Sequence, residues 1–237
     1  MKRISILFLI LMALLFAVPC FGETYYIGDV GGSQWKYWTT DCPDASNGTN
    51  CTANDIQGCC DDLDGSDPAN TVIICPYDDN VFSGADIDGN GKLKTQANNL
   101  IIKGYPGETI KLLGTGTGEH LFDLDHTGWE LHNITLGDTD NTKYAIICTG
   151  GAGSFTSYGL TIEGGDHAVY LDNACDWNGY RTTIKDTEDA DLFMYINHSD
   201  IDVNLYGFEI KSNPGEAQLR NFNSFNIYNG VWSGSSG

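Results

Sequence analysis

The chain has 237 residues, 41% of them hydrophobic, so it can bury one substantial core. Its 32 acidic and 12 basic residues give a formal net charge of −20. This charge argues against nucleic acid and anionic membrane surfaces as partners, because both need a basic footprint on the protein. Cations and neutral sugars are compatible with it.

Residues 1–22 have the pattern of a secretory signal peptide. Two basic residues precede an apolar run from Ile4 to Val18, and small residues at Cys20 and Gly22 would allow cleavage before Glu23. The apolar run is shorter than the roughly 20 residues that span a bilayer. We therefore expect a secreted or cell-surface protein with no membrane insertion after cleavage.

Residues 23–96 are expected to contain one or more N-terminal strands, a disulfide-rich loop segment and the first coil of the domain. Five cysteines lie close together in this segment: Cys42, Cys51, Cys59, Cys60 and Cys75. In an exported chain this spacing predicts disulfides. Zinc is the weaker alternative, because there is no CxxC pair and no His between the first and last of these cysteines.

Two further cysteines, Cys148 and Cys175, bring the number after signal cleavage to seven. An odd number leaves one thiol free or paired between chains. The sequence leaves the connectivity open.

The stretch DIDGNGKL, residues 86–93, is a candidate Ca²⁺ site. Asp86, Asp88 and Asn90 alternate before Gly91, as in the first half of an EF-hand loop. The twelfth position is Ala97 rather than the Glu that completes such a loop. A turn between strands that is rich in Asp, Asn and Gly would explain the same residues without a metal.

Residues 97–237 contain short β-type runs in two alternating series. The first series is NNLIIKG (98–104), NITLGD (133–138), GLTIEGG (159–165), RTTIKD (181–186), GFEIKS (207–212) and NGVWSG (229–234). The second is HLFDLD (120–125), YAIIC (144–148), HAVYLDN (167–173), LFMYIN (192–197) and AQLRN (217–221).

These runs repeat with a period of one coil. After a longer first step, the marker residues of the first series recur at intervals of roughly two dozen residues: Ile102, Leu136, Ile162, Ile184 and Ile210. Each repeat would supply two strands and a sharp corner, and such a unit buries its apolar face only by stacking on copies of itself. The pattern predicts a solenoid rather than an antiparallel sandwich.

Three asparagines recur where second-series strands end. Asn173, Asn197 and Asn221 are evenly spaced along the sequence. Stacked at the strand spacing of about 4.8 Å, their amides would form a hydrogen-bonded ladder between coils.

Three segments resemble the secreted, right-handed parallel β-helix proteins of the pectate-lyase-like superfamily. They are TYYIGDVGGSQ (24–34), NTVIICPYDDNVFSG (70–84) and NNLIIKGYPGETIKLLG (98–114). The Gly-x-Tyr that usually follows the second segment is absent, and the Cys-rich stretch is longer than a simple linker. The resemblance implies an all-β, right-handed parallel β-helix with a Cys-rich loop segment near its N-terminus.

The same resemblance leaves the activity open, because the superfamily includes polysaccharide lyases, glycoside hydrolases, epimerases and noncatalytic surface proteins. We expect a protein that binds or processes extracellular polysaccharide, and, if it is an enzyme, a lyase or a hydrolase. The alternative is a noncatalytic structural or adhesive surface protein. No catalytic motif of the family is present to assign catalytic residues.

Some side chains could serve a lyase or a sugar site. Lys185 and Lys211 occupy equivalent positions and are candidate bases, as are Arg181 and Arg220. Aromatic residues that could stack on sugars occur throughout the coils: Trp129, Tyr158, Tyr170, Trp177, Tyr180, Tyr195, Tyr206, Tyr228 and Trp232. We expect most of them to pack within or between coils.

The end of the sequence, residues 226–237, stops soon after another expected strand, without a capping helix. A solenoid needs its terminal face protected. We therefore expect either a continuation of the chain or a capping partner at this end.

Overall fold

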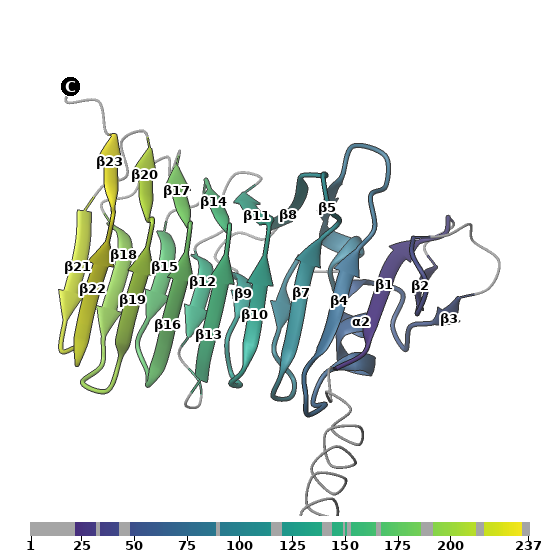
Figure 1. The fold of residues 1–237 in the computed structure, drawn as a ribbon, viewed down its shortest axis with the longest axis horizontal. Coiled ribbons are helices and arrows are strands. Elements are labelled where there is room, and N and C mark those ends of the chain that lie inside the picture. The colour runs from purple at the N-terminus through teal and green to yellow at the C-terminus, as the bar shows by residue number, and fades with distance from the viewer. Residues whose placement is uncertain are drawn as a thin grey trace, which may run out of the picture.

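The computed structural model is a parallel β-solenoid whose coils stack along one axis (Figure 1). The structure describes residues 22–31, 34–42, 48–88, 91–114, 120–138, 144–148, 150, 153–164, 167–185, 192–211 and 216–233. Within them the predicted all-β architecture of stacked parallel coils is confirmed.

Three sheets form the walls of the solenoid. Sheet A contains β1 (Thr24–Asp29), β2 (Trp35–Trp38), β3 (Thr49–Asn50), β4 (Asn70–Ile74), β7 (Leu100–Gly104), β10 (Trp129–His132), β13 (Gly153–Tyr158), β16 (Cys175–Tyr180), β19 (Asp202–Tyr206) and β22 (Ser224–Tyr228). Sheet B contains β5 (Val81–Ser83), β8 (Ile110–Gly114), β11 (Ile134–Asp138), β14 (Thr161–Glu163), β17 (Thr183–Lys185), β20 (Glu209–Lys211) and β23 (Val231–Ser233). Sheet C contains β6 (Leu93–Lys94), β9 (His120–Asp123), β12 (Tyr144–Cys148), β15 (His167–Leu171), β18 (Leu192–Asn197) and β21 (Glu216–Arg220).

Each complete coil contributes one strand to each sheet, so the prediction of two strands per repeat is wrong. The two predicted series correspond mainly to sheets B and C. Most strands of sheet A are not predicted, because sequences such as CDWNGY in β16 place Gly at an inward position and Tyr at an outward one, which weakens the apolar alternation.

The first marker residue was also assigned to the wrong wall of the solenoid. Ile102 lies in β7 of sheet A and pairs with Leu131. The residue equivalent to Leu136 in the preceding coil is Leu112 in β8. The long first step between marker residues therefore disappears. Both β7 and β8 alternate buried and half-buried residues, and the sequence pattern does not distinguish them.

The core is built from inward-facing side chains that stack from coil to coil. In sheet A, Leu100, Trp129, Phe155 and Trp177 are consecutive in register and all buried. The polar atom of the last ring has a partner, because the indole N–H of Trp177 donates to Ser157 Oγ at 3.0 Å. The row is thus removed from water while this buried donor stays hydrogen-bonded.

The N-terminal end of the solenoid is covered. The helix α2 (Ile56–Leu63) begins at Asp55, whose side chain accepts a hydrogen bond from the backbone N–H of Gly58 at 2.7 Å. It packs its buried face, including Ile56 and Leu63, against the core at this end (Figure 1). Strand β2 pairs antiparallel with β1 and with β3, so the edge of sheet A at this end is the two-residue strand β3.

The N-terminal segment contains two disulfides, Cys42–Cys75 and Cys51–Cys59. The predicted disulfides are thus confirmed, and the structure supplies the connectivity. Disulfides of this kind are typical of proteins that fold in an oxidising compartment. The apolar run assigned to a signal peptide lies outside the described residues. No helix within the described ranges is long and apolar enough to cross a membrane.

The opposite end of the solenoid is formed by the last described strands, β21 to β23 (Figure 1), and β22 and β23 carry exposed apolar side chains. Val231 is 57% exposed and Trp232 is 63% exposed. Side chains at equivalent places in earlier coils, such as Ile210, are buried by the coil that follows. The continuation or capping partner expected at this end stays a prediction.

Candidate functional site

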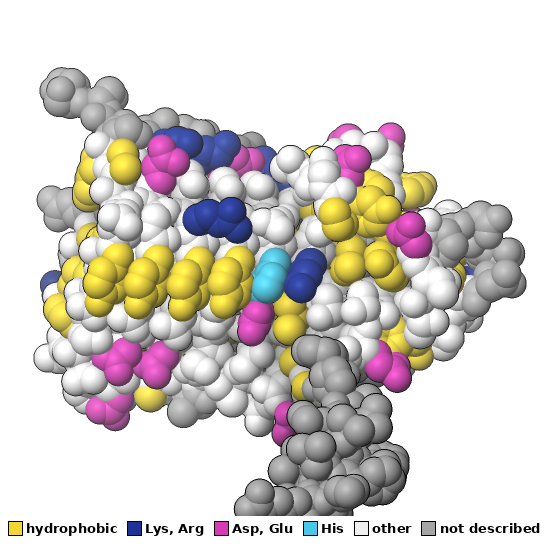
Figure 2. Space-filling model, viewed as in Figure 1, with side chains coloured by type: hydrophobic (Ala, Val, Ile, Leu, Met, Phe, Trp, Pro, Cys, Tyr) yellow, Lys and Arg dark blue, Asp and Glu magenta, His cyan; other side chains and the backbone are white. Residues whose placement is uncertain are grey.

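The outer face of sheet A presents a row of side chains along the solenoid axis. Figure 2 shows a line of hydrophobic side chains, followed by a His and a basic side chain. The strand register identifies the row as Tyr228, Tyr206, Tyr180, Tyr158, His132 and Lys103. We call the four tyrosines the tyrosine row.

The tyrosine rings stack face to face. Their centroids are 4.8 Å apart from Tyr158 to Tyr180, 5.0 Å from Tyr180 to Tyr206 and 4.6 Å from Tyr206 to Tyr228. The planes of each pair lie within 8°. In-register parallel strands lie about 4.8 Å apart, so identical residues at equivalent positions stack directly. The inner rings therefore offer a ligand their edges and hydroxyl groups, not their faces.

An amide row runs beside the tyrosine row, two residues earlier in each strand. It consists of Asn178, Asn204 and Asn226, preceded in register by Thr156. The Asn204 amide donates to Asn178 Oδ1 at 3.3 Å, and Asn226 donates to Asn204 Oδ1 at 3.0 Å. An Asn side chain has two donors and two acceptor sites, so each amide keeps hydrogen-bonding capacity for a ligand.

Two carboxylates border the amide row on its other side. Asp176 accepts a hydrogen bond from the backbone N–H of Asp202 at 2.8 Å, and Asp202 accepts one from the Asn223 amide at 2.9 Å. Asp176 also lines a shallow hollow of about 370 Å³, together with Asp200 and Ser154. This edge of the face is therefore acidic.

A His–carboxylate pair lies next to Tyr158, at the N-terminal end of the tyrosine row. His132 Nε2 lies 2.7 Å from Glu130 Oε2, and the centroids of the His132 and Tyr158 rings are 4.5 Å apart. Burial, with the nearby Glu130 and Tyr180, raises the pKa of Tyr158 above its ordinary value. Tyr158 is thus a protonated hydrogen-bond donor at neutral pH.

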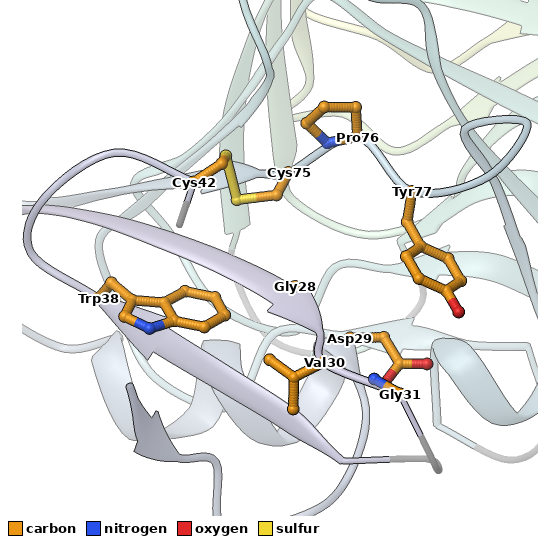
Figure 3. A pocket seen from close by; sticks show the side chains of 9 residues that line it. All are labelled: Gly28, Asp29, Val30, Gly31, Trp38, Cys42, Cys75, Pro76 and Tyr77. Atoms are coloured by element: carbon orange, nitrogen blue, oxygen red, sulfur yellow. A yellow bond between two sulfur atoms is a disulfide. The ribbon is translucent and has the colours of Figure 1, made fainter. Parts of the chain in front are cut away.

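A second hollow, of about 420 Å³, lies in the N-terminal segment beside the Cys42–Cys75 disulfide (Figure 3). Its lining includes Trp38, Asp29 and Tyr77, and Figure 3 shows the two aromatic side chains on opposite sides of the chain near Gly28. Trp38 is only 8% exposed, so its ring is mostly covered. The sequence did not indicate this hollow, because the Cys42–Cys75 disulfide joins two lining segments that lie far apart in the sequence.

The candidate Ca²⁺ ligands are only partly described. Asp86 accepts a hydrogen bond from the backbone N–H of Ser83 at 3.1 Å, and Asp88 accepts one from that of Lys92 at 2.8 Å. Asn90 lies outside the described residues. Within the described ranges no group of three or more His, Cys, Asp or Glu could hold a metal ion. The backbone contacts fit the metal-free turn as well, and the Ca²⁺ site stays a prediction.

The candidate bases are distributed over different parts of the solenoid. Lys185 and Lys211 are in register on sheet B, as expected from their equivalent positions. Lys185 pairs with Glu163 at 2.6 Å and Lys211 with Glu209 at 2.9 Å. Arg181 lies in a turn after β16 with φ 54°, and Arg220 ends β21 in sheet C. The structure does not bring the four together into one site.

The predicted asparagine ladder is confirmed between Asn197 and Asn221. Asn221 donates to Asn197 Oδ1 at 3.4 Å. Asn197 in turn donates to Asp172 Oδ1 at 3.1 Å. Asp172 follows Leu171, the partner of Ile196, and so lies at the level of Asn197. On the other side Asn197 is in register with Arg220, and Asn221 bonds it from the next position along the chain.

The tyrosine row was not singled out from the sequence, although a signal for it exists. Its members follow one another at nearly the same intervals as the marker residues of sheet B. The same periodicity test would have found the row if it had been applied to aromatic residues.

Comparison with protein-family models, with curated proteins and with solved structures found no match to this chain.

Proposed function

We propose that this chain binds an extended polysaccharide along the outer face of sheet A. The observation that carries the proposal is the parallel course of two polar rows, the tyrosine row and the amide row, in register over successive coils. An extended polymer of repeating hydroxyl groups is the ligand whose form matches a surface that repeats every strand spacing of about 4.8 Å.

The contacts to such a ligand are hydrogen bonds rather than ring stacking. The inner ring faces are covered by neighbouring rings, so the phenol hydroxyls and the free amide positions make the contacts. Each hydrogen bond contributes modestly, on the order of 1 kcal/mol, and affinity comes from repeating it along the chain.

A neutral polysaccharide fits this face better than a polyanion. The whole chain has a formal net charge of −20, and Asp176 and Asp202 border the amide row. These charges repel an acidic polymer unless cations intervene.

We also propose that the chain is secreted and belongs to the pectate-lyase-like superfamily. The stacked parallel coils, the two disulfides and the resemblance of residues 24–34, 70–84 and 98–114 support this assignment. We assign binding without a reaction, because the candidate bases lie apart on sheets B and C and in a turn.

A structural or adhesive rod is the second candidate function. It is favoured by the same two rows, because stacked rings and interlinked amides also hold coils together without any ligand. On this view the outer face of sheet A needs no partner.

Binding to insoluble neutral polysaccharides separates the two functions. The test variant is Tyr180→Phe combined with Tyr206→Phe, which keeps the stacked rings and removes two hydroxyls. The matched control is Tyr195→Phe, whose ring stacks on Tyr170 at 4.6 Å on sheet C. We expect the wild type and the control to be depleted equally from solution, and the test variant to bind about tenfold more weakly.

The absence of depletion by every neutral polysaccharide tested would contradict the proposal and favour the structural rod. Equal binding by the wild type and the double variant would show that sheet A is not the binding face. Thermal melting of all three proteins establishes that they are folded alike.

A further inference from the structure

Two buried cysteines, Cys148 and Cys175, lie at one corner of the solenoid. Cys148 ends β12, before the turn that leads to β13, and Cys175 begins β16, after the next turn of the same kind. Both are fully buried and neither is in a disulfide. Their side chains are hydrogen-bonded to each other. The two sulfur atoms are therefore neighbours, although the cysteines belong to different coils.

The backbone holds the two turns together on both sides of this pair. The backbone N–H of Asp172 donates to the carbonyl of Cys148 at 2.9 Å, and that of Gly153 donates to the carbonyl of Ala174 at 2.9 Å. Gly153 is in register with Cys175. A Cβ atom on Gly153 would lie 3.6 Å from Cys175 Sγ, so the glycine leaves the space beside this sulfur free of a side chain.

We propose that Cys148 and Cys175 are an oxidation site, and that they form a third disulfide which links neighbouring coils when the chain folds in an oxidising compartment. The existing disulfides at Cys42–Cys75 and Cys51–Cys59 fit such a compartment. The proposal is independent of the polysaccharide proposed above.

The oxidant is a small-molecule disulfide such as glutathione disulfide. The thiolate of one cysteine attacks it, forms a mixed disulfide and releases one glutathione. The thiolate of the second cysteine then attacks the protein sulfur of the mixed disulfide and releases the other glutathione. The two cysteines lose two protons and two electrons in total, and one glutathione disulfide becomes two glutathione molecules.

The oxidation takes place during folding rather than in the finished solenoid. The hydrogen bond that the Cys175 thiol makes with Cys148, together with burial, raises the pKa of Cys175, so the folded thiol forms little thiolate. While the coil is still open, the same thiols are exposed to the oxidant at their ordinary pKa.

The third free cysteine, Cys60, is the one left unpaired by this assignment. It lies in α2 beside Cys59, which is already bonded to Cys51. Burial and the nearby carboxylate of Asp61 raise the pKa of the Cys60 thiol. The odd number of cysteines expected after signal cleavage is then accounted for by three disulfides and one buried thiol.

The test is a map of free and linked thiols. The full chain is refolded with reduced and oxidised glutathione, unfolded without reductant in the presence of iodoacetamide, digested and analysed by mass spectrometry. We expect Cys60 to be alkylated and the peptides containing Cys148 and Cys175 to be recovered as one linked pair. Alkylation of both of these cysteines, or linkage of either one to Cys60, would overturn the proposal.

Two variants test the effect of the link on stability. The double variant Cys148→Ser with Cys175→Ser removes the disulfide, and Cys60→Ser is the matched control that keeps it. Under oxidising conditions we expect the double variant to melt on the order of 10 °C below the wild type, and Cys60→Ser to keep the linked peptide pair. An unchanged melting temperature in the double variant would contradict a stabilising link between coils. The peptide map of the wild type decides the proposal even if a variant does not fold.

Discussion

Glu163 links three coils through the outer surface of sheet B. Its carboxylate binds the ammonium groups of Lys111, two coils earlier, and Lys185, one coil later. The Lys111 side chain reaches it by crossing Gly137, where a Cβ would lie 2.5 Å from Lys111 Cε. Because Gly137 has no side chain, Lys111 can pass over the intervening coil and pair with Glu163. Burial acts to raise the pKa of Glu163, but the two lysines outweigh it and hold the pKa below its ordinary value of 4.5.

We predict that Glu163→Gln lowers the free energy of unfolding by about 1 kcal/mol at pH 7, because the pairs are partly exposed and screened by solvent. A carboxyl whose pKa is lower in the folded state stabilises the fold above its unfolded-state value of 4.5. This contribution declines as the pH falls through the folded-state pKa. Urea unfolding at pH 7 and pH 3 should therefore show a difference between wild type and variant at pH 7 that shrinks at pH 3.

The matched control is Glu209→Gln, because the lysine that pairs with Glu209, Lys211, is more exposed than either lysine that pairs with Glu163. We expect its effect to be within about 0.5 kcal/mol at either pH. A difference between wild type and Glu163→Gln that persists unchanged at pH 3 would show that the carboxylate charge is not its cause.

At the scale of the strand, identical residues stacked in register hold one coil to the next. Tyr180 lies between Tyr158 and Tyr206, and the centroids of both neighbouring rings lie within 5.0 Å of its own. Each such aromatic pair is worth about 0.5–1.5 kcal/mol beyond its buried area. The row thus contributes to stability whether or not it also binds a ligand.

We predict that Tyr180→Ala lowers the free energy of unfolding by about 2–3 kcal/mol, because it removes two ring contacts at once. Tyr180→Phe keeps both contacts and is expected to change stability by less than about 0.5 kcal/mol. Chemical denaturation of the three proteins measures the difference. Equal destabilisation by Ala and Phe would mean that the hydroxyl, not ring stacking, supplies the stability.

At the scale of the whole molecule, the solenoid is asymmetric. The helix α2 and the antiparallel strands β2 and β3 cover one end, whereas the last described coil, β21 to β23, has exposed apolar residues such as Trp232. Each coil of a solenoid is stabilised by its neighbours on both sides. The last described coil has a described neighbour on one side alone.

We predict that backbone amides in β22 and β23 exchange with deuterium roughly tenfold or more faster than those in β13 and β14, because local opening costs less free energy there. Hydrogen exchange read by mass spectrometry measures this directly. Equal protection at the two places would indicate that another element covers the last coil in solution.

The sequence by itself determined the class of fold. Apolar alternation that recurs at coil-length intervals requires stacked coils, because no single repeat can bury its own apolar face. The crowded cysteines likewise predicted disulfides. The sequence could not determine the number of strands per coil, since β16 carries Gly179 at a buried position where alternation needs an apolar side chain, and Tyr180 at an outward one.

Tertiary structure decided which residues meet. Register placed Asp172 beside Asn197, and separated Ile102 from the other marker residues. It also aligned four tyrosines and brought Cys148 beside Cys175. Such neighbours depend on how many residues each turn takes up, and a shift of one residue moves a side chain to the other face of the sheet. A linear pattern records the period of the coil but not this alignment.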